Sequence, residues 1–302
     1  ETWLILTYIV EFPIDFCRKL GQESYRKLNY RVCIYLLLIT IFEFLSFEEI
    51  MSTIELENCV IEEYFVDQTG STSTDLLNYV KSHVVETPRL LCAHRQTAGR
   101  GTRGRKWQNL GESLTFSIAI PITGELNNWA GVTLAIGVSI AKTYRDLGVP
   151  AFVKWPNDIL LNDKKLSGIL VEVAQDLDKK WVLVIGVGVN CIRSDSIHDE
   201  TDYGVAFLSD AISISNKMDW LRAISRSILL AVAQMGKEGL KPTRESWATI
   251  SAYSNELVWV FEENGPGYQA RVKTIDDMGC LVVETESGIK SLVSGTISLR
   301  KF

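Results

Sequence analysis

The chain has few of the residues from which metal centres and histidine-based catalytic sites are built. Its six cysteines are scattered without a Cys-x-x-Cys pair, and its three histidines, His83, His94 and His198, lie far apart. Cys92 and His94 could share one side of a strand, but no second pair would complete a zinc site. These absences argue against a structural zinc site and against a histidine-based triad. We interpret the cysteines as reduced and mostly buried, which suits a cytoplasmic protein.

A basic charge balance and a long apolar run are absent as well. The formal net charge is −6, which gives no reason to expect a nucleic-acid partner. The apolar run at 32–42 contains eleven uncharged residues and stops at Glu43, whereas a membrane span needs about 20. We therefore expect neither nucleic-acid binding nor stable membrane insertion.

Residues 1–50 differ in character from the rest of the chain. They are rich in large apolar side chains, and the first methionine of the sequence is Met51. The apolar run is misplaced for a secretory signal, and no small-residue cleavage site follows it. Three interpretations remain: a helical extension packed on the domain, a segment on a membrane surface, or upstream DNA translated in frame. We favour the third, so that residues 1–50 are an apolar extension outside the native protein.

Hydrophobic patterns after Met51 predict an α+β domain over residues 51–254. Strands are expected at 61–66, 89–93 and 113–121, and helices at 71–80, 127–147, 220–235 and 243–250. Four more strand-like segments are expected at 152–155, 158–161, 166–173 and 181–189. These four follow one another too closely to enclose crossover helices. The sheet is therefore expected to be mixed and largely antiparallel, with flanking helices.

A second pattern begins near residue 255. Five short strands are expected there, separated by turns at 264–267, 276–279 and 287–288. Short, evenly spaced strands of this kind are typical of a small β-barrel, which we assign to residues 255–302.

The stretch 96–107, Q-T-A-G-R-G-T-R-G-R-K-W, contains the letters G-x-G-x-x-G without the context that this fingerprint needs. A Rossmann loop opens directly into a helix, and a P-loop needs Lys-Ser/Thr after its last glycine. Here Arg105, Lys106 and Trp107 follow, and then a strand; no H-R-D or D-F-G motif marks a kinase. Residues 87–111 hold six Lys/Arg and no Asp or Glu. The stretch is therefore interpreted as a flexible cationic loop that suits an anionic small-molecule group.

Three further motifs follow the loop. They are K-W-P-N-D at 154–158, K-L-S-G-I-L at 165–170 and G-V-G-V-N at 186–190. Taken singly, each is explained by a turn, a surface lysine or a packing glycine. Together with G-S-T-S-T-D (70–75), the loop at 96–107 and G-T-I-S-L-R (295–300), they strongly resemble the motifs of the biotin protein ligases. The resemblance extends from about Tyr64 to Leu299.

The resemblance implies a class II synthetase-like catalytic domain over 51–254 and an SH3-like C-terminal domain over 255–302. It implies an ATP-dependent ligase, a biotin–[acetyl-CoA-carboxylase] ligase, that forms biotinyl-5′-AMP from biotin and MgATP. The biotinyl group then passes to a specific lysine of a biotin carboxyl carrier protein of acetyl-CoA carboxylase. Some family members carry an N-terminal DNA-binding domain, but residues 1–50 are too few and too apolar for one, with only five Lys/Arg. We expect a cytoplasmic ligase that is not a repressor, and the family's dimers make a homodimer a further expected partner.

The family's site residues carry over by position. The biotin contacts implied are Ser71, Thr72, Gln96, Gly99, Arg100, Lys165, Gly168 and Gly186. The ATP and adenylate contacts implied are Arg100, Gly101, Arg103, Arg105, Trp107, Asn157 and Asn190. The catalytic residues implied are Lys165, Arg100 and Asp158. Lys165 would neutralise charge as the biotin carboxylate attacks the α-phosphate, and Asp158 would orient or deprotonate the acceptor lysine. No protein metal ligand is expected, because Mg²⁺ enters with ATP.

The chain departs from the family's pattern in two places. Gly70 and Ser73 stand where Asp and Asn are frequent, which leaves Ser71 and Thr72 in place but changes the helix cap. Thr102 stands where many relatives have arginine. The missing guanidinium leads to the hypothesis that biotinyl-AMP is either held by other donors or released more readily.

Two rival functions remain at this point. A lipoate- or octanoate-protein ligase shares the fold and the adenylate chemistry but lacks a K-W-P-N-D motif. A non-catalytic biotin-dependent regulator would bind biotin without transferring it, and the presence of both Arg100 and Lys165 argues against it.

Overall fold

The computed structural model describes residues 60–108, 111–193, 204–262, 265–294 and 297–301. The interpretations of residues 1–50 and the boundary predicted at residue 51 lie outside these ranges. No helix within the described ranges is long and apolar enough to span a membrane.

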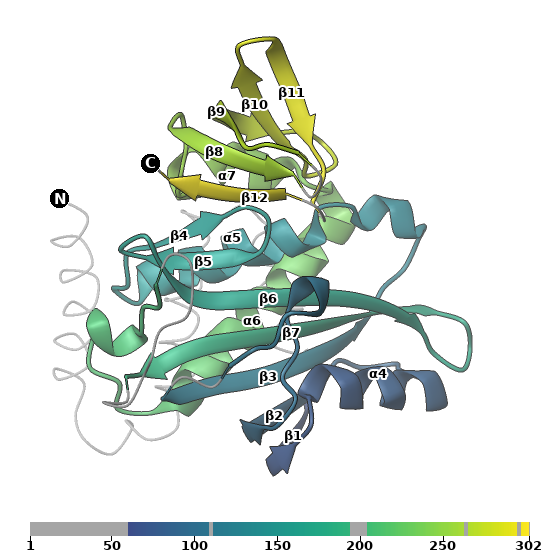
Figure 1. Ribbon diagram of the computed structural model, residues 1–302. Coiled ribbons are helices and arrows are strands. Elements are labelled where there is room, and N and C mark those ends of the chain that lie inside the picture. Colours follow the sequence, from purple (N-terminus) through teal and green to yellow (C-terminus); the bar gives the residue numbers. More distant parts are fainter. Residues whose placement is uncertain (1–59, 109–110, 194–203, 263–264, 295–296, 302) are drawn as a thin grey trace, which may run out of the picture. The chain divides into compact units, whose positions relative to one another are not determined.

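A seven-stranded sheet forms the larger of two sheets in the described chain (Figure 1). Its strands, in spatial order, are β1 (Glu62–Thr69), β2 (Arg89–Gln96), β3 (Glu112–Pro121), β7 (Trp181–Ile192), β6 (Lys164–Gln175), β5 (Asp158–Leu161) and β4 (Ala151–Lys154). Strands β1 and β2 pair in parallel, because helix α4 (Thr72–Ser82) connects them as a crossover, and every other neighbouring pair is antiparallel. The prediction of a mixed, largely antiparallel sheet is confirmed.

Helix α4 packs on one face of this sheet. It begins at Ser71, whose hydroxyl oxygen accepts from the backbone N–H of Thr74, as expected for an N-cap residue. Its buried side chains Leu76 and Val80 pack in one cluster with Ala119 of β3 and with residues 174, 182 and 184 of β6 and β7. Since strand side chains alternate between faces, the even-numbered residues of β6 and β7 point toward this side. Gly168 of β6 and Gly186 and Gly188 of β7 share that parity.

The opposite face is covered by helices α5 (Val132–Asp146), α6 (Lys217–Glu238) and α7 (Lys241–Ile250). Gly137 of α5 lies against the odd-numbered Ile169 of β6, at an ordinary contact distance for an added Cβ. The helix expected over 127–147 begins later than predicted, because Leu126–Trp129 forms a separate 3₁₀ turn. Gly131, in the left-handed conformation with φ of 81°, separates the two. Its closest neighbours are Leu240 and Gly279, so long-range packing determines where the helix begins.

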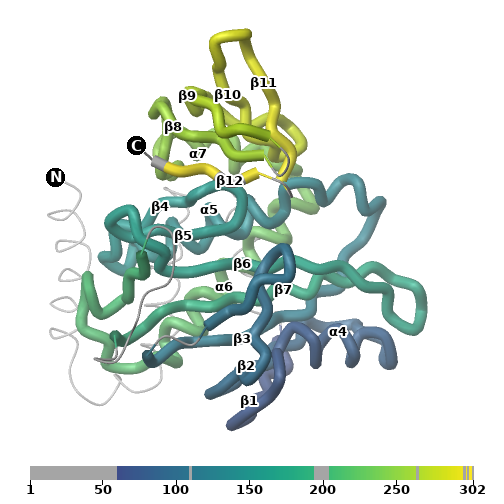
Figure 2. Tube along the Cα trace, in the orientation of Figure 1, coloured from purple at the N-terminus to yellow at the C-terminus, as the bar shows by residue number. Residues whose placement is uncertain are grey.

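The C-terminal segment forms a second, antiparallel sheet (Figure 2). Its strands are β8 (Leu257–Glu262), β9 (Tyr268–Ile275), β10 (Leu281–Thr285), β11 (Gly288–Leu292) and β12 (Ile297–Lys301), in the spatial order β11-β10-β9-β8-β12. Alternate residues of β8, such as Val258 and Val260, are fully buried, which gives this segment a core of its own. The predicted all-β C-terminal segment of five strands is confirmed.

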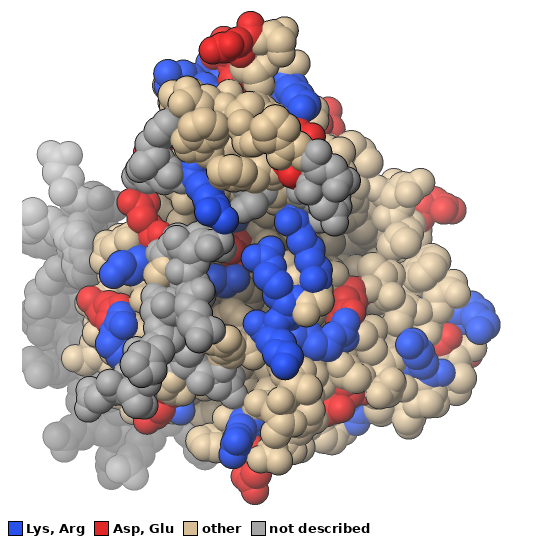
Figure 3. Space-filling model, in the orientation of Figure 1, with Lys and Arg blue, Asp and Glu red and all other residues tan. Residues whose placement is uncertain are grey.

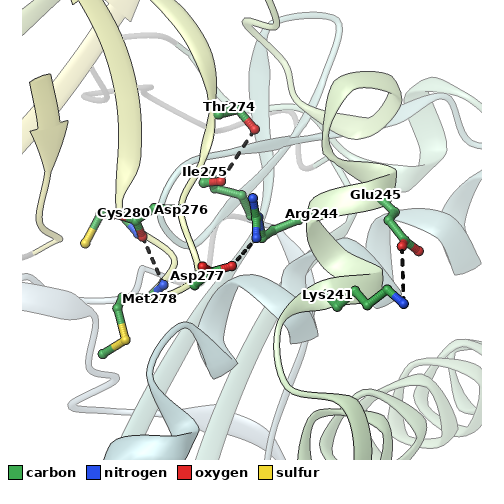
Figure 4. Close-up of polar contacts among 9 residues, drawn as sticks. All are labelled: Lys241, Arg244, Glu245, Thr274, Ile275, Asp276, Asp277, Met278 and Cys280. Atoms are coloured by element: carbon green, nitrogen blue, oxygen red, sulfur yellow. Dashed lines mark hydrogen bonds and ion pairs between the residues drawn. The ribbon is translucent and has the colours of Figure 1, made fainter. Parts of the chain in front are cut away.

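Three polar contacts hold the second sheet against the larger one. Arg244 of α7 pairs with Asp277 in the β9–β10 turn, and Trp155 Nε1 donates to the carbonyl of Gly279 at 3.0 Å. Figure 4 shows the neighbouring Asp276, whose carboxylate accepts from the backbone N–H of Met278 within the same turn. The third contact comes from the glycine loop: Arg103 Nη2 donates to the carbonyl of Ile297, the first residue of β12, at 2.7 Å. The cationic loop is thus attached directly to the C-terminal sheet.

Candidate active site

A cavity of about 330 Å³ opens on the α4 face of the large sheet. Glycines form much of its floor: Gly168 of β6 is paired with Gly188 of β7, and Gly186 lies one step along the same face. A Cβ at Gly188 would lie 2.8 Å or less from three ring atoms of Trp107. A Cβ at Gly168 would lie 3.1 Å from both the Trp107 ring and Lys165 Nζ. The glycines therefore make the space into which Trp107 and Lys165 project.

One end of the cavity is closed by hydroxyl and amide groups. The side-chain oxygen Gln96 Oε1 accepts from the backbone N–H of Thr72 at 2.8 Å and from its hydroxyl at 3.1 Å. Ser117 Oγ lies 2.8 Å from Thr72 Oγ1 and 3.0 Å from Ser73 Oγ. Thr72, Ser73 and Ser117 are buried. This end presents neutral groups that can donate or accept, fixed in place by their own network.

The other end carries charge. Lys165 Nζ lies 2.5 Å from Asp158 Oδ1 and 5.8 Å from the centre of the Trp107 ring. The Lys165 and Asp158 side chains are 24% and 12% exposed, so the pair is largely withdrawn from water. Asp158 sits at the start of β5 and Lys165 near the start of β6, and the β5–β6 hairpin brings the two together. A cation at this end can neutralise an anionic ligand group, and a carboxylate beside it can orient an amine.

The cationic loop forms one wall. It closes as a small hairpin, in which the Gly101 N–H donates to the carbonyl of Arg105 at 2.8 Å and the Trp107 N–H donates to that of Gly99 at 3.0 Å. An added Cβ at Gly99 would lie 2.9 Å from the Trp107 carbonyl oxygen, so this glycine allows the two loop strands to approach. Figure 3 shows Lys and Arg side chains gathered around a hollow on this side of the molecule.

Arg100 is engaged with other protein groups at the rim of this wall. Its guanidinium pairs with Glu172 Oε1 of β6 at 2.5 Å and donates to Thr74 Oγ1 of α4 at 3.3 Å. These contacts attach the cationic loop to both the sheet and the helix. Glu172, which the motifs did not single out, holds Arg100 at this rim.

A second cavity, also about 330 Å³, adjoins the first. The two share part of their lining, namely Thr102, Arg105, Asn157, Asp158, Ile169 and Leu170. The second cavity lies between this shared wall and Ile297 and Leu299 of β12, and its cations are Arg103, Arg105 and Lys154. Lys154, at the end of β4, is only 4% exposed, and burial lowers its pKa to about 8.

The structure brings most of the expected site residues to the first cavity. Its lining includes Ser71, Thr72, Gln96, Arg100, Gly101, Arg105, Trp107, Asn157, Asp158, Lys165, Gly168 and Gly186. Three expected residues lie elsewhere. Arg103, with φ of 60°, lines the second cavity. Gly99 packs against the backbone of Trp107. The buried Asn190 donates to the carbonyl of Lys165 at 3.1 Å.

Sequence reasoning missed several residues of the two cavities. Ser73, Ser117, Phe116 and Gly188 line or support the first cavity, and Lys154 lines the second. Gly188 could have been found, because it lies two residues from Gly186 in one strand and so faces the same side. Ser117 carries no comparable signal, because both of its neighbours in the strand, Phe116 and Ile118, are apolar.

The cysteines and metal ligands do not form a site in the described ranges. Cys92 and Cys191 are buried, and burial raises the pKa of both thiols to about 11, which leaves them protonated and unreactive at neutral pH. Within the same ranges no group of three or more His, Cys, Asp and Glu side chains is placed to hold a metal ion. Asp158 is the single carboxylate lining the two cavities in this part of the chain.

The geometry can be compared with known proteins. Residues 65–190 match the biotin/lipoate A/B protein ligase family, and residues 261–300 match the biotin protein ligase C-terminal domain. The chain is 31% identical over 237 residues to the bifunctional ligase/repressor BirA of Escherichia coli, covering 78% of this chain and 72% of that protein. It is 37% identical over 135 residues to the biotin–[acetyl-CoA-carboxylase] ligase of Mycobacterium tuberculosis, covering 43% of this chain and 49% of that one.

A solved structure extends the similarity to the fold. The biotin protein ligase from Aquifex aeolicus in complex with biotin and ATP aligns with a TM-score of 0.68 at 25% identity, covering 80% of this chain and 99% of that one. The family matches fall on both sheets, so the α+β fold with a C-terminal β domain is confirmed.

Proposed function

The chain belongs to the biotin protein ligase family, and we propose that it joins biotin to ATP to form biotinyl-5′-AMP and then transfers the biotinyl group to a carrier-domain lysine. One observation carries the proposal. A single cavity has a neutral hydroxyl and amide network at one end and the Lys165–Asp158 pair at the other. Biotin has the same polarity, with a neutral ureido group at one end and a carboxylate at the other.

The match of polarity supports one orientation of biotin in the cavity. Its ureido group would lie against Thr72, Ser73 and Gln96, whose groups can donate and accept. Its apolar ring would lie along Gly186, beside the Trp107 ring that rests on Gly188, and its carboxylate would point toward Lys165. Of the remaining expected contacts, Ser71 and Gly168 line the same cavity.

In the first step the carboxylate oxygen of biotin attacks the α-phosphorus of ATP, and pyrophosphate leaves. Charge builds on the α-phosphate oxygens, and Lys165 with Arg105 would neutralise it where the two cavities meet. Asn157 and Asn190, held by bonds to the carbonyls of Ile169 and Lys165, remain proposed adenylate contacts. Mg²⁺ would enter on the phosphates of ATP as part of the substrate.

In the second step an amine of the carrier attacks the biotinyl carbonyl of the mixed anhydride, the bond from that carbonyl carbon to the phosphate oxygen breaks, and AMP leaves. A protonated lysine is not a nucleophile, so the incoming ammonium must lose a proton. Asp158 lies in the wall shared by both cavities and is placed to orient or deprotonate it. Its pairing with Lys165 holds the carboxylate in one position until the amine arrives.

The test is biotin-dependent exchange of labelled pyrophosphate into ATP, followed by transfer of labelled biotin to a biotin carboxyl carrier domain. We expect both activities, and we expect lipoate to support neither. Lys165→Met should lower the exchange rate by about 100-fold or more, in the range found when one electrostatic donor is removed. Lys241→Met, at a side chain that is 75% exposed, is the matched control and should leave exchange unchanged. Exchange with lipoate, or biotin binding without exchange, would refute the proposal in favour of one of its two rivals.

The partner proposed for the transfer step is the biotin carboxyl carrier protein domain of acetyl-CoA carboxylase. We also propose that the chain forms a homodimer through a sheet edge. Strand β1 lies at one edge of the larger sheet, and its Tyr64 and Phe65 side chains are exposed. After Ile169, whose outer N–H and carbonyl bond to Asn157, strand β6 pairs only with β7 within the described ranges, so its other edge is open there. Sedimentation analysis with and without biotinyl-AMP tests the dimer, and a monomer in both conditions would exclude it.

We further propose that the chain is not a repressor and that it is located in the cytoplasm. The net charge of −6 supports a chain that does not bind DNA. A sequence-specific shift of a biotin-operon promoter fragment would contradict this part alone.

A further inference from the structure

The backbone of Lys165 is bonded to a segment outside the recognised motifs. Strand β7 pairs with β6 from Ser167 onward, and the position beside Lys165 is filled instead by residues 204–206, which run parallel to the start of β6. The Lys165 N–H donates to the carbonyl of Gly204 at 3.1 Å, and the N–H of Ala206 donates to the carbonyl of Lys165 at 2.9 Å. Both backbone polar groups of this lysine are therefore held by residues 204–206.

These bonds determine where the Lys165 side chain begins. A residue whose N–H and carbonyl are both bonded keeps its backbone orientation, and with it the direction of its Cβ. Nζ, at the end of that side chain, lies 2.5 Å from Asp158 Oδ1 at the charged end of the first cavity. Because a misplacement of about 1 Å can cost ~100-fold in rate, the position of residues 204–206 bears directly on catalysis.

Arg193, one residue after the end of β7, holds this segment in place. Its Nη2 donates to the carbonyl of Val205 at 3.3 Å and pairs with Asp210 Oδ2 at 3.1 Å. Its Cζ lies 4.4 Å from the centre of the Phe207 ring. Asp210 Oδ2 also accepts from the N–H of Phe207 at 2.9 Å. One guanidinium and one carboxylate thus fix three points of the segment that follows Gly204.

The guanidinium adds direction to a segment that is otherwise held by apolar packing. Val205 and Phe207 are 4% and 0% exposed, and burial of apolar surface is not directional. Arg193 instead donates to the carbonyl of Val205, the residue that forms the parallel bridge with Lys165. The Arg193 and Asp210 side chains are 48% and 31% exposed, so their ion pair contributes little to global stability. Loss of Arg193 should therefore change position more than stability.

We infer, on the basis of the proposed function, that Arg193 is a positioning residue for Lys165. Arg193 is not among the described residues that line the two cavities, and it acts through Val205 and the backbone of Lys165. Its contribution is to keep Nζ where the ammonium can neutralise the charge that builds on the α-phosphate oxygens.

A double-mutant cycle between Arg193 and Lys165 tests this inference. If Arg193 acts through the Lys165 side chain, its removal has no further effect once that ammonium is gone. We measure kcat and the KM for ATP in biotin-dependent ATP–pyrophosphate exchange. Arg193→Met should lower kcat by about 10- to 100-fold, up to the cost of a 1 Å misplacement, and leave the KM for ATP within about twofold. In the Lys165→Met background the same change should leave kcat within about twofold, because no ammonium remains to be misplaced.

Two further variants complete the cycle. Arg193→Lys keeps a cation that can pair with Asp210 and donate to the carbonyl of Val205, so it should restore most of the lost kcat. Arg222→Met is the matched control, because Arg222 is 67% exposed and pairs with Asp219 at 3.8 Å on the surface of α6. It should leave kcat unchanged.

Hydrogen exchange at the Lys165 amide gives a readout that does not depend on activity. This N–H is bonded to the carbonyl of Gly204, so a loosened segment exposes it more often. Its exchange rate should rise about tenfold in Arg193→Met, as expected when one charge-assisted contact is lost, and stay unchanged in Arg222→Met.

Two outcomes would overturn the inference. An equal fall in kcat in the wild-type and Lys165→Met backgrounds would mean that Arg193 supports the fold or the site independently of Lys165. Unchanged exchange at the Lys165 amide in Arg193→Met would mean that Arg193 does not hold residues 204–206. A wild-type chain without biotin-dependent exchange would instead refute the proposed function, while the amide measurement would still show whether Arg193 holds the segment.

Discussion

The contact between Gly188 and Trp107 leads to a quantitative prediction for Gly188→Ala. The new methyl group would lie 2.8 Å or less from three atoms of the indole ring, whereas carbon atoms in contact are ~3.5–4.0 Å apart. The ring must therefore move by roughly 1 Å, a displacement that can cost about 100-fold in rate when it misplaces a bound substrate. We expect kcat/KM for biotin in the exchange reaction to fall by about that factor.

Stability should change much less than activity. Overpacking costs ~1–3 kcal/mol, and alanine in a strand recovers ~0.5–1 kcal/mol of backbone entropy relative to glycine. The difference is at most about 2.5 kcal/mol, or roughly a 10 °C fall in Tm at ~2–4 °C per kcal/mol for a chain of this size. The variant should thus remain folded at 25 °C, where activity is measured.

Gly265→Ala is the matched control, because nothing lies within 4 Å of a Cβ at that position. It should change neither Tm nor kcat/KM. If Gly188→Ala retained wild-type kcat/KM for biotin, the position of the Trp107 ring would not matter for the biotin site, and the orientation proposed for biotin would be wrong.

Three further predictions concern other parts of the site. Thr102 lies in the wall shared by the two cavities, so Thr102→Arg should add a charge-assisted contact worth about 1.5–3 kcal/mol and slow biotinyl-AMP dissociation about tenfold to hundredfold; an unchanged dissociation rate would contradict this. Gly279→Ala should destabilise the chain by roughly 2–5 kcal/mol in urea unfolding, because the left-handed backbone strains alanine and the new Cβ would lie 2.8 Å from Gly131 Cα. Gly288→Ala, with φ of 117° and open space around it, separates backbone strain from this clash. Lys154 holds its proton to about pH 10.5 when unfolded but only to about pH 8 when folded, so its own contribution to the free energy of unfolding rises with pH between these values. The buried thiols of Cys92 and Cys191 contribute with the opposite sign above about pH 9, so the free energy of unfolding of the wild-type chain should rise relative to that of Lys154→Met over this range. A parallel pH dependence in both chains would exclude the Lys154 contribution.

The positions of the strands in the sequence were predictable, because side-chain alternation and turn residues are local signals. The parallel pairing of β1 with β2 was not specified by any local pattern, since it depends on helix α4 crossing over the sheet. The start of helix α5 was misplaced for a related reason. Gly131 reads as a small residue inside a helical pattern, but its contact with Gly279, 148 residues later, sets its conformation.

The site was predictable where a motif places its residues close together in sequence. The resemblance identified Lys165 and Asp158, and the β5–β6 hairpin then brings them within 2.5 Å. The direction of a side chain was not predictable. Arg103 is one of three loop arginines with similar sequence surroundings, and only its left-handed backbone turns it toward Ile297 and away from the first cavity. The burial of Lys154, which is 4% exposed, is likewise not indicated by any local pattern.

The hydrogen bond from Arg103 to the carbonyl of Ile297 has a thermodynamic consequence for the whole chain. A ligand that orders the cationic loop also favours the docked position of β12, because one guanidinium belongs to both. Linkage is reciprocal, so docking of β12 and binding of such a ligand strengthen each other by the same coupling free energy. The small β domain is in this sense a binding partner of the loop that is covalently attached to it and present at a high effective concentration, so its docking contributes to the affinity of the loop for any ligand that orders it.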